Sequence, residues 1–127
     1  MSKYKEKVKM YTISKEFHFS AAHQLNGLPD NHQCSRLHGH NYIVVVELQC
    51  NQLNDVGFVV DYGNLSPLKT YIDNILDHRN LNDVLPFQTS AENLAKHFYE
   101  FCKEHWDETS SVKVSETPKT WAIYHEE

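Results

Sequence analysis

The chain has 127 residues, the length of one ordinary domain, and 40% of them are hydrophobic, which is enough for a globular core. Its formal net charge of −5 excludes a surface that wraps nucleic acid, since the basic residues do not cluster, although a few local cations could hold a small anion. The lack of any run of about 18 apolar residues predicts no membrane span, and three widely spaced cysteines predict no disulfide scaffold and a reducing, cytoplasmic environment.

Residues 1–9 carry charges without an apolar stretch, so we expect a flexible tail rather than a secretory signal, followed by a single domain over 10–127. Alternation of apolar with polar side chains predicts a strand over about 10–19, with Tyr11, Ile13, Phe17 and Phe19 on the apolar parity. A polar segment over 24–37 follows. Loops of this length inside small domains are usually functional or mobile.

The rest of the chain gives further strand and helix signals. A valine-rich strand is expected over 40–49 and a short one over 58–60, and the spacing of apolar residues predicts an amphipathic helix over 65–76. Thr89-x-x-Glu92 is typical of a capping box, so a second helix is expected from there to about residue 102. Two closing strands are expected over 112–116 and 120–124. This order indicates an α+β fold, an antiparallel sheet with its helices on one face.

Three histidines and a cysteine lie within eighteen residues: His23, Cys34, His38 and His40. Residues two apart on a strand point the same way, so His38 and His40 present their rings to one face. Gly39 between them lets the backbone approach a ligand. His23 follows the first predicted strand and reaches the same point if the two strands pair. Three neutral imidazoles around an open fourth position are typical of catalytic zinc, so we expect Zn²⁺ here.

Other interpretations of this cluster compete with a catalytic metal. A lone His-x-His is more often an ordinary polar pair at a strand end, and only the added His23 and cysteine favour a metal. A closed structural zinc with Cys34 as its fourth ligand is geometrically possible. In cupin oxygenases a glutamate follows His-x-His after three or four residues, whereas Glu47 lies seven residues past His40 and faces the other side of the strand.

Five motifs in a common order carry a resemblance to a known family. They are Phe19-Ser20-Ala21-Ala22-His23, Cys34-Ser35-Arg36-Leu37-His38-Gly39-His40-Asn41-Tyr42, Leu76-Asp77-His78-Arg79-Asn80-Leu81-Asn82, Glu92-Asn93-Leu94-Ala95 and Val114-Ser115-Glu116-Thr117-Pro118. From about Tyr11 to Tyr124 the chain resembles the 6-pyruvoyltetrahydropterin synthase family, and most closely its bacterial branch, the 6-carboxytetrahydropterin synthases of queuosine biosynthesis. Each motif alone is modest in specificity, and the shared order makes the resemblance specific.

The resemblance implies a T-fold (tunnelling fold), in which a four-stranded antiparallel sheet carries two helices on one face. It also implies trimers whose sheets join into a barrel, two trimers stacked into a homohexamer, and active sites between subunits. The implied zinc ligands are His23, His38 and His40. The implied proton relay consists of Cys34, Asp77 and His78.

The resemblance also assigns two substrate-binding positions. Glu116 matches the carboxylate that anchors the pterin ring, and a carboxylate suits the paired N–H donors of that ring edge. Ser90 matches a position near the pterin. Taken without the resemblance, Glu116 would be a solvated charge, Ser90 a helix cap, and Asp77-His78 a pair beside a helix C-terminus.

The implied activity is a zinc lyase that converts 7,8-dihydroneopterin triphosphate into 6-carboxy-5,6,7,8-tetrahydropterin, acetaldehyde and triphosphate. Only three residues separate Cys34 from His38, which favours this branch over the pyruvoyl-forming one, where that stretch is longer. A variant of the family with glutamate in place of the cysteine is disfavoured by Cys34. Either His32 or Arg36 could meet the triphosphate, and the sequence does not choose between them.

Overall fold

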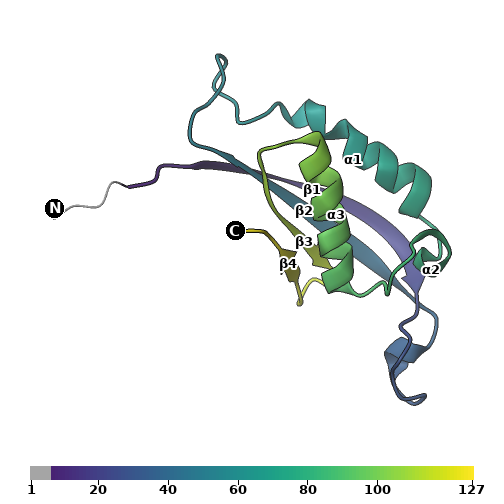
Figure 1. Cartoon of the computed structure of the whole chain (residues 1–127). Helices are drawn as coiled ribbons and strands as arrows, with labels where there is room; N and C mark the ends of the chain where they lie inside the picture. The colour runs from purple at the N-terminus through teal and green to yellow at the C-terminus, as the bar shows by residue number, and fades with distance from the viewer. Residues whose placement is uncertain (1–6) are drawn as a thin grey trace, which may run out of the picture.

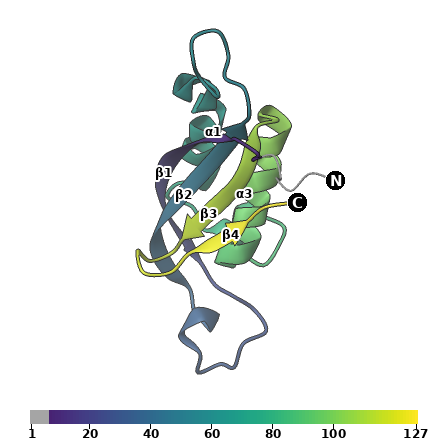
Figure 2. The same ribbon diagram turned by 90° about the vertical axis from the view of Figure 1, so that its left-hand side faces the viewer.

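The computed structural model describes residues 7–127 and consists of one four-stranded antiparallel sheet with helices on one face (Figures 1 and 2). The strands lie in the order β1 (Tyr11–His23), β2 (His38–Cys50), β3 (Thr109–Ser115) and β4 (Ala122–Tyr124). The helices are α1 (Ser66–Tyr71), α2 (Leu81–Val84) and α3 (Ala91–His105). The predicted α+β class and the four-stranded antiparallel sheet are therefore confirmed.

The sheet buries one face because its strands alternate in polarity. Phe17 and Phe19 on β1 and Val44, Val46 and Leu48 on β2 are all buried beneath the helices. Burying each of these side chains contributes about 1.5–3 kcal/mol. Helix α3 packs over β3 and β4, while the helical residues 72–76 lie against β1. The core thus runs along the same strands that end in the histidines.

β1 and β2 form a long hairpin whose register places Tyr11 opposite Cys50 and His23 opposite His38. Both strands extend further than predicted, to His23 and from His38, so the histidines are strand residues. The connecting residues 24–37 project beyond the end of the sheet (Figure 1). Of the predicted N-terminal tail, residues 1–6 lie outside the described residues, and Lys7, Val8 and Lys9 are exposed and precede β1.

The strand predicted over 58–60 is wrong. Asn54 organises a turn there, because its side-chain oxygen accepts hydrogen bonds from the backbone N–H groups of Val56 (3.1 Å) and Phe58 (3.0 Å). The backbone N–H of Asn54 also donates to the carbonyl of Phe58 at 2.9 Å. Val59 and Val60 pack against the core without pairing to the sheet. An Asx turn has replaced the expected strand.

The helix predicted over 65–76 is present but is not one uniform α-helix. A 3₁₀ turn over Tyr62–Leu65 leads into α1, which has Pro67 in its first turn, and a π-helical turn over Ile72–Leu76 follows. None of the helices in residues 7–127 has both the length and the apolar character needed to cross a membrane. The short helix α2 was not predicted.

The capping box predicted at Thr89 is displaced by one residue. Ser90 is the N-cap of α3, and its hydroxyl accepts a hydrogen bond from the backbone N–H of Asn93 at 3.2 Å. Thr89 is thereby freed from the cap and lies fully buried beside β1. Its new partner is a histidine of the functional site.

Candidate metal centre

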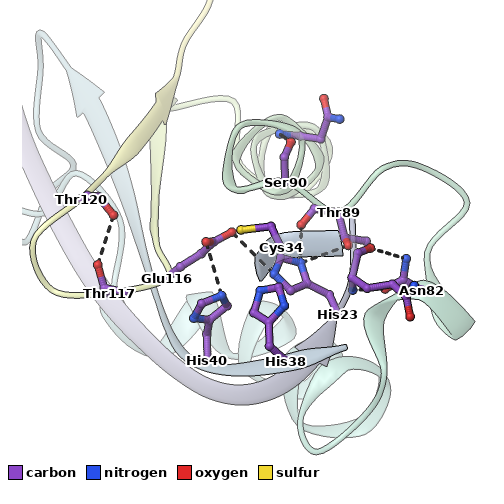
Figure 3. A network of polar contacts seen from close by, with 12 residues as sticks. His23, Cys34, His38, His40, Asn82, Thr89, Ser90, Glu116, Thr117 and Thr120 are labelled. Carbon is purple, nitrogen blue, oxygen red and sulfur yellow. Dashed lines mark hydrogen bonds and ion pairs between the residues drawn. The ribbon is translucent and has the colours of Figure 1, made fainter. Parts of the chain in front are cut away.

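Three histidines converge at the end of the β1–β2 hairpin, on the helix-covered face of the sheet (Figure 3). Cross-strand pairing sets His23 opposite His38, and His40 follows on the same face of β2. Their ring centroids are 4.6 Å (His23–His38), 4.8 Å (His38–His40) and 5.2 Å (His23–His40) apart. One nitrogen from each ring lies within 4.8 Å of the other two. The strand pairing alone therefore assembles a possible ligand set.

Hydrogen bonds to backbone carbonyls set the tautomer of two of these rings. The Nδ1 atom of His23 lies 2.8 Å from the carbonyl oxygen of Thr89, and that of His38 lies 2.7 Å from the carbonyl oxygen of Arg36. A carbonyl oxygen only accepts, so Nδ1 carries the hydrogen in both rings and Nε2 of the neutral ring presents a lone pair. The Nε2 atoms of His23, His38 and His40 are all buried without a hydrogen-bond partner in the described chain.

Burial also favours the neutral form of the rings. The pKa of His23 is lowered to about 4, mainly by desolvation; the hydrogen bond to the Thr89 carbonyl opposes this shift, and the charge of His38 and His40 adds to it. Desolvation likewise lowers the pKa of His40, with His38 as the second cause. Neutral imidazoles with inward lone pairs are the form that binds a divalent cation. The donor set therefore fits a metal, and imidazole ligands suit zinc.

Cys34 lies outside the three-histidine group, because the ligand atoms within 4.8 Å of one another come from the histidines only, among residues 7–127. It is half-buried in a 3₁₀ turn, Gln33–Ser35, where its N–H donates to His32 Nδ1 at 3.0 Å. Its carbonyl accepts from the N–H of Leu25 at 2.8 Å and closes the projecting loop. In Figure 3 its sulfur points to the side of the cluster where Glu116 lies. This placement supports an open metal site over a closed one.

Glu116 and Ser90 line one pocket of about 230 Å³ beside the histidines, together with Leu25 and Trp121. The carboxylate of Glu116 lies 3.4 Å from His40 Nε2 and 3.9 Å from His23 Nε2. Desolvation raises the pKa of Glu116, and the charge of Glu92 adds to this while His38 opposes it. The structure thus brings together both residues that were predicted to bind the substrate.

Tyr42 continues the His38–His40 alternation and is fully buried. Its ring stacks on Phe19 at 4.8 Å and meets the rings of His40 and His23 edge-on at 5.5 and 5.9 Å. Its hydroxyl has no hydrogen-bond partner within the described residues. Burial, and then the charge of Glu116, raise the pKa of Tyr42, so the hydroxyl keeps its proton.

Asp77 and His78 lie at the free edge of β1. The backbone N–H of His78 donates to the carbonyl oxygen of Ser20, and the backbone N–H of Ser20 donates to Asp77 Oδ1 at 2.9 Å. The other carboxylate oxygen lies 2.9 Å from Nδ1 of His78. The Ser20 hydrogen bond, followed by His78, lowers the pKa of Asp77. His78 has a left-handed backbone (φ 59°), which is uncommon away from glycine and tends to persist where function needs it.

Cys34 and the Asp77–His78 pair do not meet within one chain. No hydrogen bond or ion pair between them occurs in residues 7–127, and the side chain of His78 is 81% exposed. His78 borders a shallow depression of about 510 Å³ with Ser20, Gly39 and Asn41. Ser20, Gly39 and Asn41 alternate with the buried residues, so this depression opens on the sheet face away from the helices.

Two amide side chains fasten the chain that leaves His23. Asn82 accepts from the N–H of Gln24 (2.9 Å) and donates to its carbonyl (2.9 Å), as Figure 3 shows for Asn82. Gln88 repeats the pattern on Asn26, accepting at 3.1 Å and donating at 2.6 Å. Each side-chain amide thus makes the pair of hydrogen bonds to backbone N–H and C=O that a neighbouring strand would make. These amide clamps connect the β1 end of the site to residues that follow His78.

Sequence reasoning missed four contributors to the site. The Thr89 and Arg36 carbonyls and the amide of Asn82 left no sequence signal, because their partners are distant or are backbone atoms. Tyr42 did leave one, since it follows His38 and His40 at the same parity of β2 and therefore shares their face.

The chain is similar in sequence to proteins of a known family. Residues 12–127 match the family described as 6-pyruvoyl tetrahydropterin synthase. The chain is 32% identical over 127 residues to the 6-carboxy-5,6,7,8-tetrahydropterin synthase of Bacillus subtilis, spanning 90% of this chain and 84% of the relative. It is 35% identical over 127 residues to the synthase of the same name from Synechocystis, spanning 91% and 93%.

A solved structure agrees with the fold. The 6-pyruvoyl tetrahydropterin synthase of Caenorhabditis elegans is similar with a TM-score of 0.81 at 27% sequence identity, covering 97% of this chain and 100% of the other. The T-fold expected from the motifs is therefore confirmed.

Proposed function

Since this chain belongs to the 6-pyruvoyl tetrahydropterin synthase family, we propose that it is a zinc-dependent 6-carboxy-5,6,7,8-tetrahydropterin synthase of queuosine biosynthesis. The reaction consumes 7,8-dihydroneopterin triphosphate and one water and yields 6-carboxytetrahydropterin, acetaldehyde and triphosphate. The observation that carries this proposal is the convergence of three buried, unpartnered Nε2 atoms beside a pocket lined by Glu116. The names of the curated relatives favour the carboxy-forming branch.

His23, His38 and His40 would hold the metal. When bound, Zn²⁺ supplies a Lewis acid that polarises the side-chain oxygens of the substrate and eases removal of neighbouring protons. Three neutral ligands leave the cation its full charge. The carbonyls of Thr89 and Arg36 keep the rings of His23 and His38 turned so that Nε2 faces the metal.

Glu116 orients the heterocycle. Its carboxylate accepts two hydrogen bonds from the pterin, one from the exocyclic amino group and one from the adjacent ring N–H. Ser90 and Trp121 also line this pocket. The pterin ring is thereby fixed with the side chain of the substrate toward the three histidines. Glu116 thus contributes by orienting the substrate and takes no part in bond making or breaking.

Proton transfer belongs to Cys34, Asp77 and His78. The thiolate of Cys34 takes a proton from the substrate side chain. Asp77 accepts from Nδ1–H of His78, which leaves Nε2 of that ring to exchange protons, and the lowered pKa of Asp77 keeps it charged for this role. Because Cys34 and His78 do not meet in one chain, the relay is completed by a neighbouring subunit, in a homohexamer made of two trimers. We place this assembly in the cytoplasm.

A product assay tests the reaction. Purified protein is incubated with 7,8-dihydroneopterin triphosphate, and the products are identified by mass, with acetaldehyde trapped as its hydrazone. We expect the carboxy product and acetaldehyde in equal amounts. A pyruvoyl product without acetaldehyde would instead establish the alternative, triphosphate elimination alone, the activity named for the Caenorhabditis elegans protein.

A second assay separates catalysis from a purely structural zinc. Cys34→Ala is expected to retain both zinc and fold while losing turnover, since Cys34 stands outside the ligand group. Loss of zinc and fold together in this variant would favour a non-catalytic protein with a closed metal site.

A further inference from the structure

A buried hydrogen-bond donor without an acceptor lies beside the metal centre. The hydroxyl of Tyr42 is inaccessible and unpartnered in the described chain, while its ring is fixed by Phe19 and by the two histidine rings. Leaving a buried hydroxyl unpaired destabilises a fold, so such groups in native proteins usually have a use. The neighbouring residues along β2 on this face are apolar, apart from the histidines.

A carboxylate that lacks a donor lies close by. The contacts of Glu116 to Nε2 of His40 and His23, at 3.4 and 3.9 Å, are its ion-pair contacts in residues 7–127. Nε2 of neutral His23 carries a lone pair, because its Nδ1–H is given to Thr89, so it cannot donate to the carboxylate. A metal held by the three histidines takes the Nε2 lone pair of His40 as well. Glu116 then needs another donor.

Strand register sets the two groups across from each other. Val44 pairs with Val114 and Ile43 with Ser115, and continuing this antiparallel register by one residue places Glu116 opposite Tyr42. Directly opposed residues in adjacent strands have Cβ atoms about 4.5–5.5 Å apart. Tyr42 lies at the buried parity of β2. Glu116 lies one residue past the end of β3 and continues the parity of the buried Val112 and Val114, so both side chains project toward the helices. Tyr42 is thus the hydrogen-bond donor that the β2–β3 register places across from the Glu116 carboxylate.

We propose that Tyr42 is a positioning residue of this site: once a metal occupies the three histidines, the Glu116 carboxylate turns from His40 and His23 and accepts a hydrogen bond from the Tyr42 hydroxyl. This bond would hold the carboxylate toward the pocket that it shares with Ser90 and Trp121. The inference rests on the proposed function, since the ligand received by Glu116 is the pterin edge. A carboxylate has about four lone-pair sites, so one bond from Tyr42 leaves enough for two from the ligand. Tyr42 acts on binding through Glu116 and touches no reacting atom.

The test removes one oxygen atom. Tyr42→Phe is compared with wild type in the zinc-loaded protein, using neopterin, which keeps the pterin ring but has no triphosphate to eliminate. We expect the dissociation constant of neopterin, measured by calorimetry, to rise roughly fivefold to tenfold. KM for the triphosphate substrate should rise by a similar factor with kcat nearly unchanged. Zinc content should stay the same, and the unfolding temperature should stay the same or increase.

Tyr71→Phe is the matched control. Its hydroxyl lies 2.6 Å from Nε2 of His97, away from the metal centre, so this variant loses a hydrogen bond that the fold already uses. We expect a lower unfolding temperature and an unchanged affinity for neopterin. Tyr42→Phe should therefore weaken neopterin binding without lowering the unfolding temperature. Tyr71→Phe should lower the unfolding temperature without weakening neopterin binding.

A double-substitution cycle with Glu116→Gln identifies the path of the effect. If Tyr42 acts through the carboxylate, the fivefold to tenfold effect of Tyr42→Phe should shrink to less than about twofold in the Glu116→Gln background. Equal effects in both backgrounds, or an unchanged neopterin affinity in Tyr42→Phe, would overturn the inference about Tyr42 and leave the proposed function intact. Failure of wild-type protein to bind neopterin would overturn the proposed function first.

Discussion

The three-histidine centre and the Asp77–His78 pair are built in opposite ways, although both adjoin the same end of β1. His23 is completely buried and its outer nitrogen is fixed by a backbone carbonyl, whereas the side chain of His78 is 81% exposed and borders an open depression. One region is assembled within a single chain by strand pairing. The other presents a carboxylate–imidazole pair whose ring makes no further hydrogen bond or ion pair within residues 7–127. The difference indicates that the proposed metal site and the proposed proton relay depend on different levels of structure.

The largest expected effect tests whether the two regions are separable. His38→Ala should reduce bound zinc from about one per chain to near zero and abolish turnover, because two neutral ligands hold the metal poorly. His78→Ala should keep the full zinc content and lose roughly 10²–10⁴-fold in kcat, as expected for removal of a proton-transfer group. Elemental analysis and steady-state rates measure both. Loss of zinc in His78→Ala would contradict the separation.

Complementation between two inactive variants sharpens the contrast. Cys34→Ala and His78→Ala should each be nearly inactive, yet subunits of the two, mixed and allowed to exchange, should recover up to about a quarter of wild-type activity. Random assembly leaves one interface in four with both intact residues. Exchange is verified with a size-shifting tag, and a mixture of tagged with untagged Cys34→Ala is the control. Full exchange without recovery would place the relay within one chain.

Acid should destabilise the buried region. The pKa of His23 is about 4 in the folded protein and about 6.5 when unfolded. Above pH 6.5 neither state is protonated. Between 6.5 and 4 only the unfolded state takes up the proton, so the free energy of unfolding of metal-free protein should fall by roughly 3 kcal/mol across this window.

Urea titrations at pH 7.5 and pH 4.5 measure this loss. His23→Gln should flatten the dependence, while His78→Ala should keep it, since that substitution leaves the buried ring in place. An equally steep curve in His23→Gln would show that another group is responsible.

The smallest expected effect concerns the link between the two regions. Asn82→Ala removes two hydrogen bonds to Gln24 and should lower the free energy of unfolding by about 1–2 kcal/mol. Because Gln24 follows His23, a proposed metal ligand, zinc affinity should also weaken by several-fold. Asn51→Ala, at an exposed turn after β2, is the control and should change neither quantity. Unaltered zinc affinity in Asn82→Ala would limit the clamp to stability.

Much of this molecule follows from local pattern. Period-two alternation predicted β1, and the valine-rich composition of residues 40–49 predicted β2. Parity also predicted that His38 and His40 share a face, because side-chain direction on a strand depends only on parity. Helical spacing of apolar residues predicted the helix over 65–76, and the capping-box pattern predicted α3. The ordered motifs indicated the T-fold and its family. These features depend on neighbours in sequence, which a single chain displays directly.

Tertiary structure decided what depends on distant partners. The segment over 58–60 has the composition of a strand but has no strand beside it, and Asn54 turns the chain instead. Threonine is common at helix N-caps, but Thr89 lies one residue before the N-cap of α3. Its carbonyl instead accepts a hydrogen bond from His23 and orients that ring. The placement of Glu116, one residue past β3, beside the end of β2 follows from the β2–β3 register. Hydrogen-bond partners and register are properties of the packed chain, because each buried polar group takes whichever partner the fold places within reach.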